Sequence, residues 1–228
     1  MNVIIPMTGY GSRFVAAGYP ELKPFIPVME MPIIEWIVKR MYPADVHFIF
    51  VCRGEHLQKD ASMRERLLEL APEATIVSIE EWVKKGPVYD VLRAYRMLQD
   101  TIDPEEPCII NYCDFYMTWD YRQFASEARE RDCDGSVPCY TGFHPNLLPE
   151  KNYYASCLTD EEDNLIEIRE KYSFEKDKTK AKHSPGVYYF RNGRIMEKYC
   201  QMLTEHEECA INGEYYASLP YNFMVKDG

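Results

Sequence analysis

Paired cysteines, long apolar runs and an excess of positive charge are all missing from this sequence of 228 residues. None of its eight cysteines forms a C-x-x-C pair, which argues against a paired-cysteine zinc site or a disulfide framework. His206 and Cys209 have an H-x-x-C spacing with Cys200 nearby, but this is too little to predict a metal site. The cysteine pattern therefore favours a protein whose thiols stay reduced.

Apolar segments are also too short for a membrane protein, since no run approaches the roughly 18 residues of a membrane span. The first residues, MNVIIPMTG, lack the basic and apolar regions of a secretion signal. We therefore expect a soluble, cytoplasmic protein with no membrane partner.

Lys and Arg number 26 against 37 Asp and Glu, a formal net charge of −11. Because a nucleic-acid partner requires a basic face, this balance argues against nucleic-acid binding.

The pattern of apolar residues predicts an α/β fold. Hydrophobic residues make up 46% of the chain, an ordinary value for a globular protein. Short apolar runs alternate with amphipathic segments, which is typical of a mainly parallel sheet whose functional loops follow the carboxyl ends of its strands. The expected strands are residues 3–5, 46–52, 74–79, 108–110 and 136–140, and the expected helices are residues 32–41, 60–70, 87–99 and 121–131.

Residues 3–28 carry the strongest functional signal. After the first strand, Gly9, Gly11 and Ser12 allow a tight turn that can aim backbone N–H groups at a phosphate. Two cations follow: Arg13, which is forked and permanently charged, and Lys23, a movable point charge. Taken together, these residues predict a site for a phosphorylated ligand.

The order strand, G-x-G-S-R-F, a short spacer and K-P-F-I-P-V resembles the N-terminal signature of the nucleotidyltransferases that activate sugar 1-phosphates and related phosphate esters. The resemblance implies a Rossmann-like, GT-A-like three-layer domain with a mixed, mainly parallel central sheet. It also implies one domain over residues 1–228, with a nucleotide-binding half at about 1–115 and an acceptor-binding half at about 116–228. The nucleotide-binding residues it implies are Met7, Thr8, Gly9, Gly11, Ser12, Gly86 and Pro87, although the family usually has small Ala residues where Met7 and Thr8 stand.

A carboxylate ends the strand at 108–110, in the sequence N-Y-C-D. Oxygen ligands at the carboxyl end of a core strand suit Mg²⁺, and the resemblance implies that Asp114 binds the ion between the two substrates. It also implies catalytic roles for Arg13 and Lys23. Many family members place a second metal-binding Asp near the end of the chain. None stands there in this sequence, so we expect an oxygen of Asn222 or Glu214 to serve instead.

The second half of the chain contains a predicted hairpin at 153–168, whose acidic tip we interpret as a solvated turn. Glu170-Lys171 follows it, and then, after a charged loop, the segment G-V-Y-Y-F beginning at Gly186. This order resembles the acceptor-binding half of the same family. The resemblance implies that Glu170 binds acceptor hydroxyls, that Lys171 contacts the acceptor phosphate, and that Gly186 belongs to this half of the site.

These observations predict a reaction in which a nucleoside triphosphate and a small phosphate monoester give a nucleoside diphosphate conjugate and pyrophosphate. A sugar 1-phosphate used for surface or capsular polysaccharide, and a phosphocholine-like or phosphoamide-like ester used by a cytidylyltransferase, both fit. A different class is a glycosyltransferase that binds its metal through Asp132 and Asp134, although we interpret their D-C-D segment as a solvated turn. A third is a nucleotide-binding module without catalysis, which would not require both cations, Asp114 and an acceptor half.

Overall fold

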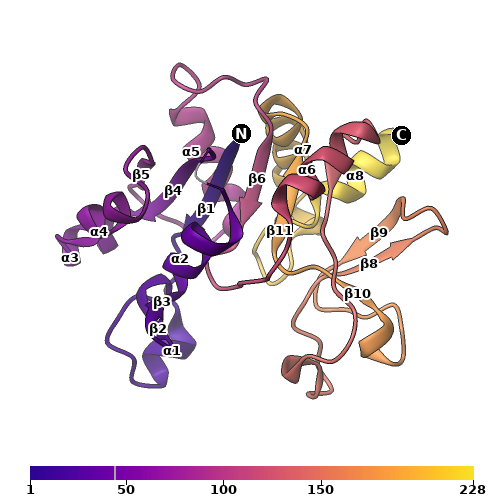
Figure 1. Ribbon diagram of the computed structural model, residues 1–228, viewed down its shortest axis with the longest axis horizontal. Helices are drawn as coiled ribbons and strands as arrows, with labels where there is room; N and C mark the ends of the chain where they lie inside the picture. The colour runs from indigo at the N-terminus through magenta and orange to yellow at the C-terminus, as the bar shows by residue number, and fades with distance from the viewer. Residues whose placement is uncertain (44) are drawn as a thin grey trace.

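One mixed sheet of six strands forms the centre of the protein, whose computed structural model describes residues 1–43 and 45–228 (Figure 1). The first four strands in the sheet run parallel, and the last two pair antiparallel. In spatial order they are β5 (Thr75–Ile79), β4 (His47–Arg53), β1 (Asn2–Met7), β6 (Cys108–Asn111), β11 (Val187–Phe190) and β7 (Gly135–Ser136).

The central strands are buried on both faces, as their continuous apolar runs predict. All six residues of β1 are buried, and alternate side chains point to opposite faces of the sheet. Ile4 belongs to one hydrophobic cluster, while Val3 and Ile5 belong to another. The strand order therefore follows from burying both faces of β1.

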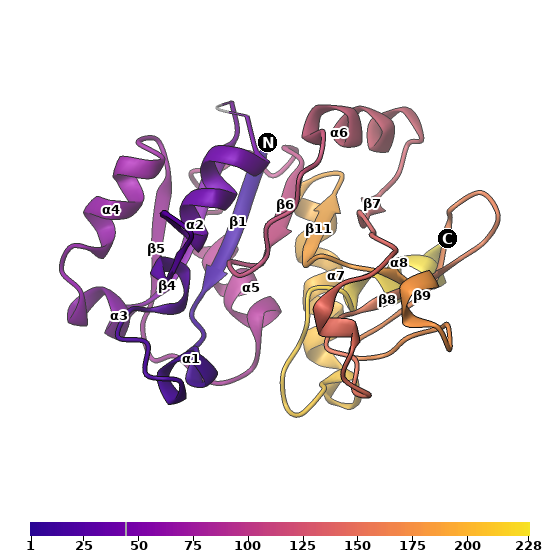
Figure 2. The same ribbon diagram turned by 60° about the horizontal axis from the view of Figure 1, so that its bottom comes forward.

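Helices cover the two faces of the sheet and complete a three-layer arrangement. Ile4 packs in a cluster with residues of α5 (Pro87–Met97) and α7 (Gly193–Glu205). Val3 and Ile5 pack in a cluster with residues of α2 (Ile33–Trp36), α4 (Met63–Leu70) and α6 (Tyr121–Glu130). Figure 2 shows the sheet lying between α2 on one side and α5 and α7 on the other.

A smaller sheet lies beside the main one in the second half of the chain (Figure 1). It consists of β10 (Lys182–His183), β8 (Ser156–Thr159) and β9 (Leu165–Arg169), and the C-terminal helix α8 (Pro220–Asp227) packs against β9. A two-stranded hairpin, β2 (Pro27–Val28) and β3 (Met31–Pro32), follows the N-terminal loop. The predicted hairpin at 153–168 is confirmed as β8 and β9.

The predicted strands and helices of the first half are confirmed, with differences at their ends. The segment expected as one helix at 32–41 is α2 followed by a π-helical turn, Ile37–Met41. The strand expected at 136–140 leaves the main sheet after Ser136, where Pro138 lacks the N–H that would continue the ladder, and Tyr140 forms an isolated bridge with His183. Among the described residues, the helices that were not predicted are α1 (Ser12–Ala16), α3 (Gly54–Lys59), α7 and α8.

Within residues 1–43 and 45–228, no helix combines the length and the apolar character needed to cross a membrane. The predicted fold class is confirmed, since the sheet is mixed but mainly parallel and carries helices on both faces. The carboxyl ends of β1, β4, β5 and β6 meet at one edge of the sheet, where a ligand site is expected in such folds.

Candidate active site

A cavity of about 270 Å³ lies at this edge of the sheet, beyond the ends of β1 and β6. It brings together segments that lie far apart in the sequence. Eight of the predicted site residues line it: Met7, Thr8, Gly9, Gly11, Lys23, Gly86, Pro87 and Asp114. The others in its wall are Pro6, Pro24, Trp82, Asp90, Tyr112, Cys113, Glu214 and Tyr216.

The glycine loop forms one wall of the cavity and leads into the short helix α1 (Ser12–Ala16). Gly11 has a φ of 60° and precedes the helix, so the turn requires a left-handed residue there. A Cβ on Gly11 would lie 3.2 Å from the Lys23 Cβ, which is a tight contact. Gly11 therefore lets the loop pass close to the lysine.

Ser12 and Arg13 belong to α1 and are not among the residues that line the cavity. The Arg13 guanidinium lies 5.9 Å from the ring centroid of Tyr153, which is in the second half of the chain. Arg13 therefore lies between the glycine loop and Tyr153 of the second half of the chain.

Lys23 and Asp114 form an ion pair at the cavity, in which Lys23 Nζ donates to Asp114 Oδ2. Lys23 opens a 3₁₀ turn in which Pro24 restricts the backbone and Phe25 is buried in the core. Burial alone would lower the pKa of Lys23, but neighbouring Cys113 and Asp114 and the hydrogen bond to Asp114 outweigh it, so the pKa is raised. The amine is thus held in its charged form.

A buried polar group forms the wall on the other side of β1. Asp90, on α5, is 1% exposed, and its Oδ2 accepts from Thr8 Oγ1 at 2.5 Å and from Trp82 Nε1 at 2.9 Å. Burial raises the pKa of Asp90, while these two hydrogen bonds and the charges of Arg93 and Arg53 act in the opposite direction.

Arg53, the last residue of β4, contacts Thr8 and Trp82 of this wall. It is 1% exposed and donates from Nη2 to the Thr8 carbonyl oxygen. Its guanidinium carbon lies 3.6 Å from the ring centroids of both Tyr10 and Trp82. The sequence analysis missed Arg53 and Trp82, because neither stands in a recognisable motif.

Gly86 joins the two halves of the chain at the start of α5. Its backbone has φ 89° and ψ 171°, and a Cβ there would lie 2.6 Å from Tyr215 N and 2.7 Å from Tyr215 O. The close approach is held by Tyr215 N donating to the Lys85 oxygen at 2.8 Å and Val88 N donating to the Tyr215 oxygen at 3.2 Å. Only glycine fits this backbone and this space.

The predicted acceptor residues lie behind the same cavity. Glu170 Oε1 accepts from Ser218 Oγ at 2.6 Å, and burial raises the pKa of this carboxyl. Lys171 Nζ donates to Tyr216 Oη at 2.8 Å, and Tyr216 Oη donates to Glu214 Oε2 at 3.0 Å. Because Glu214 and Tyr216 line the cavity, this chain of hydrogen bonds connects Lys171 to it.

Gly186 positions an aromatic wall residue. It has a φ of 82°, and a Cβ there would lie 3.0 Å from the ring of Tyr112. Tyr112 N donates to the Gly186 oxygen at 2.9 Å, and Tyr112 Oη accepts from Ala217 N at 2.9 Å. Tyr112 and Tyr216 were also missed from the sequence, since isolated tyrosines carry no spacing signal.

Asn222 requires a correction. Its Oδ1 accepts from Ile168 N at 2.9 Å, and its Nδ2 donates to the Ile168 oxygen at 2.9 Å. Both ends of the amide therefore hold α8 against β9, and Asn222 is not among the residues lining the cavity. The structure gives this residue a structural role in place of the metal-binding role we expected.

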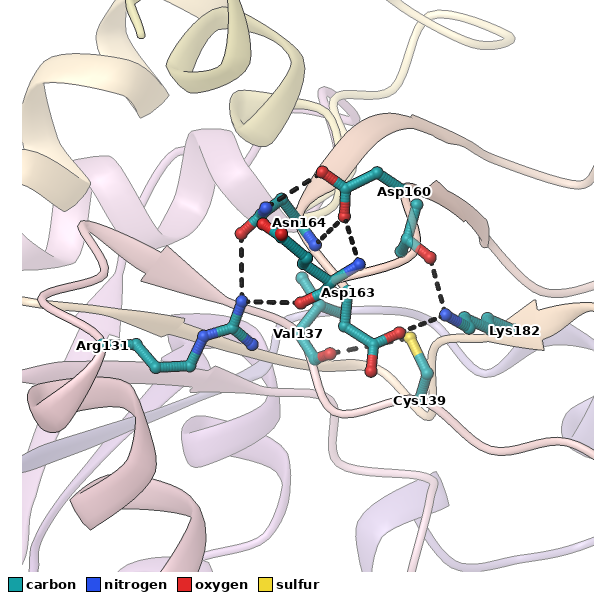
Figure 3. A network of polar contacts seen from close by, with 9 residues as sticks. Arg131, Val137, Cys139, Asp160, Asp163, Asn164 and Lys182 are labelled. Atoms are coloured by element: carbon teal, nitrogen blue, oxygen red, sulfur yellow. Dashed lines mark hydrogen bonds and ion pairs between the residues drawn. The ribbon is translucent and has the colours of Figure 1, made fainter.

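The acidic segments of the second half are structural. Arg191 pairs with Asp132 Oδ1 and Asp134 Oδ1 at 3.0 Å each, so both carboxylates of the D-C-D segment are occupied by a cation. At the hairpin tip, Asp160 accepts from the backbone N–H groups of Glu162 at 3.0 Å and Asn164 at 2.8 Å. Figure 3 shows this turn tied to neighbouring elements by Arg131 and by Lys182, which pairs with Asp163.

Among the described residues, no three His, Cys, Asp or Glu side chains gather into a metal-binding group. Mg²⁺ commonly binds one or two carboxylates together with substrate phosphates and water, and does not need such a group. Asp114 lines the cavity beside the glycine loop, and its side chain is 41% exposed. This donor set fits an ion that arrives with a phosphorylated substrate.

Comparison with known proteins decides the family. The model of the MobA-like NTP transferase domain matches residues 3–176, which is more than half of the chain. The chain belongs to this family. It is thus a nucleotidyltransferase, as the N-terminal signature indicated. No curated protein matches the sequence.

Solved structures share the fold of this NTP transferase at low identity. The nucleoside-diphosphate-sugar pyrophosphorylase from Vibrio cholerae RC9 is 18% identical with a TM-score of 0.79, over 99% of this chain and 88% of that one. A UDP-glucose pyrophosphorylase complexed with UDP-glucose is 16% identical with a TM-score of 0.72, over 100% and 87%. HddC from Yersinia pseudotuberculosis, complexed with GMP-PN, is 16% identical with a TM-score of 0.60, over 87% and 79%.

Proposed function

We propose that this NTP transferase couples a nucleoside triphosphate to a small phosphate monoester in a Mg²⁺-dependent reaction that releases pyrophosphate. The observation that carries the proposal is the Lys23–Asp114 pair in a cavity that the glycine loop also lines. This arrangement places a cation, a candidate metal ligand and turn N–H groups around one space. A phosphate chain needs all three.

The proposed reaction needs charge neutralisation and alignment, with little covalent work by the protein. An oxygen of the acceptor phosphate attacks the α-phosphorus, the bond from that phosphorus to the bridging α–β oxygen breaks, and pyrophosphate leaves. The backbone around Gly9, Gly11 and Ser12, together with Arg13, holds the β- and γ-phosphates and stabilises the leaving group. Lys23 meets the negative charge at the α-phosphate.

Asp114 is the residue that would hold Mg²⁺ in this proposal. When bound, the ion neutralises phosphate charge and helps to fix the geometry of the two substrates. Lys23 pairs with Asp114 in the structure, so Mg²⁺ bound to this carboxylate would take the place of Lys23 Nζ and leave the amine to meet the phosphates. Glu214, which also lines the cavity, is the remaining candidate for a second oxygen of the two residues considered from the sequence.

We propose that the acceptor lies on the side of Glu170, Lys171 and Gly186. The hydrogen-bonded chain from Lys171 through Tyr216 to Glu214 supports this, because it links Lys171 to two residues that line the cavity. The names of the similar structures, a nucleoside-diphosphate-sugar pyrophosphorylase and a UDP-glucose pyrophosphorylase, favour a sugar 1-phosphate as acceptor. We also propose that the enzyme acts in the cytoplasm and that its product is a precursor of a surface polysaccharide. Asp132 and Asp134 pair with Arg191 and, unlike Asp114, are not among the residues that line this cavity, which argues against the glycosyltransferase alternative.

The direct test is pyrophosphate release with Mg²⁺, measured for all common nucleoside triphosphates against sugar 1-phosphates and small phosphoesters. Release with one combination establishes the reaction, and the absence of both release and nucleotide binding refutes it. The Lys23→Ala variant should lower turnover by orders of magnitude with little change in melting temperature, since the pair it breaks is partly exposed. Lys39→Ala is the matched control, because Lys39 pairs with Glu35 on an exposed helix surface. Equal turnover in the two variants would remove Lys23 from the reaction.

A further inference from the structure

Asp90 has one carboxylate oxygen whose hydrogen bonding is incomplete. Its Oδ2 accepts from Thr8 and Trp82, but its Oδ1 is buried and has no partner among the described residues. Leaving a buried acceptor unpaired costs free energy, so such an oxygen calls for a donor. Arg53 Nε and Nη1 are also buried without a partner among the described residues, but neither donates to Asp90. Because Asp90 lines the cavity, a ligand in that cavity can bring the donor.

The position of Asp90 indicates which part of a nucleotide would lie beside it. Lys23 is on the side of the sheet where Phe25 packs with Val3 and Ile5, whereas Asp90 is on the side where Val88 packs with Ile4. The phosphates are attracted to Lys23 and the glycine loop and are repelled by a carboxylate. The wall around Asp90 instead offers Trp82 and Pro87, apolar surfaces suited to a planar base.

The carboxylate is held rigidly by groups that also favour its ionised form. Thr8 and Trp82 both donate to Oδ2, and Arg53 fixes these two residues through the Thr8 carbonyl and the Trp82 ring. The positive charges of Arg53 and Arg93 oppose the effect of burial on the pKa of Asp90. An acceptor held in this way discriminates between ligands better than a mobile surface carboxylate.

We propose that Asp90 Oδ1 accepts a hydrogen bond from the exocyclic amino group of the nucleobase, so that the enzyme selects an amino-bearing base over uracil and thymine. The proposal rests on the proposed function, because it assumes that a nucleoside triphosphate occupies this cavity. Asp90 is a specificity-determining residue in this proposal and takes no part in the chemistry at phosphorus.

The chemistry of the bases supports this choice. The amino groups of cytosine, adenine and guanine are donors, and carboxylates accept from them in nucleic-acid recognition. Uracil and thymine present one N–H that is flanked by two carbonyl oxygens, so a carboxylate that approaches it also faces negative charge. A wrong base therefore leaves Asp90 Oδ1 unpaired or in contact with another acceptor.

The first experiment is calorimetric titration of the wild-type enzyme with CTP, UTP, GTP, ITP, ATP and purine riboside triphosphate in Mg²⁺. Each successive pair compares a base that has its amino group with a base that lacks it. We expect the amino-bearing member of the productive pair to bind about ten- to a hundredfold tighter. Tightest binding of UTP would overturn the proposal on Asp90 while leaving the proposed function intact. No binding of any nucleotide would overturn the proposed function itself.

The second experiment tests whether Asp90 causes the preference. In Asp90→Asn, the carboxamide oxygen can still accept from Thr8 and Trp82, so the fold is preserved, while the second position becomes a donor. The preference for the amino-bearing base should fall at least tenfold, with turnover on the better nucleotide less affected. Asp100→Asn, at an exposed aspartate, is the control. An unchanged preference in a folded Asp90→Asn variant would overturn the assignment. If that variant does not fold, the wild-type comparisons above still decide whether the amino group is read.

Discussion

Gly86 allows a stability prediction whose size can be worked from the structure. The Gly86→Ala variant places a Cβ on a backbone with φ 89° and ψ 171°, a conformation used almost only by glycine. The same Cβ would lie 2.6 Å from Tyr215 N and 2.7 Å from Tyr215 O. These are backbone atoms and cannot turn aside as a flexible side chain can. The substitution therefore combines backbone strain with steric overlap.

The two effects can be separated with a matched control. Backbone strain costs about 1–3 kcal/mol, and forcing an extra carbon into a packed site costs about 1–3 kcal/mol more. Gly142 has a φ of 93°, but a Cβ there would meet nothing within 4 Å. Gly142→Ala should therefore show the strain alone, and Gly86→Ala should be less stable than this control by about 1–3 kcal/mol.

Urea denaturation of both variants and the wild type measures this difference directly. For a chain of this length, 2 kcal/mol corresponds to a difference in melting temperature of about 4–8 °C. Nucleotide binding by Gly86→Ala should also be lost, because Pro87 and Asp90 follow Gly86 on the same helix. Equal free energies of unfolding for the two variants would refute the reasoning, since the Tyr215 backbone would then place no constraint on residue 86.

Three further predictions concern the second half of the chain and the metal. Burial raises the pKa of Glu170, so the folded protein keeps this proton to higher pH than the unfolded chain does, and the free energy of unfolding falls as the pH rises through this interval. Glu170→Gln should therefore raise the melting temperature at pH 8. This gain should vanish as the pH is lowered towards the ordinary pKa of 4.5. A gain that persisted at low pH would contradict this account. Arg191→Ala should lower stability by about 1 kcal/mol without changing the Mg²⁺ dependence of turnover, because its ion pairs with Asp132 and Asp134 are structural. Asp114→Asn should abolish the response to Mg²⁺, and a normal Mg²⁺ titration in that variant would exclude Asp114 as the metal ligand.

The sheet and its helices in the first half could be predicted because burial on both faces leaves a direct record in the sequence. Strands β1, β4 and β6 are continuous apolar runs, and α5 has an apolar face together with a glycine-proline start. The length of strand β7 was overestimated, because the apolar pattern alone does not show that Pro138 lacks the N–H needed to continue the pairing. The π-helical turn after α2 has no sequence signature comparable to that of an amphipathic helix.

The residues of the candidate site also fall into those that could be predicted from the sequence and those that could not. Glycine and proline reveal their positions because they are needed for particular backbone conformations, so the loop at Gly9–Gly11 and the turn at Gly86 were found. Trp82 and Arg53 act through contacts with residues distant in sequence, and local pattern carries no trace of those contacts. Asn222 was misjudged because its place near the end of the chain suggested a metal ligand, whereas tertiary packing directs its amide to Ile168.

The shared central sheet limits how substrates can enter. Strand β11, in the second half of the chain, pairs with β6, in the first half, through four residue pairs from Val187–Asn111 to Phe190–Cys108. A hinge motion between the two halves of the chain would have to break these strand pairs, so the two halves cannot rotate apart. The nucleotide and the acceptor are then expected to influence one another's binding through their charges, because the sheet holds both at fixed positions. A coupling between their affinities that weakens with added salt would indicate this electrostatic effect.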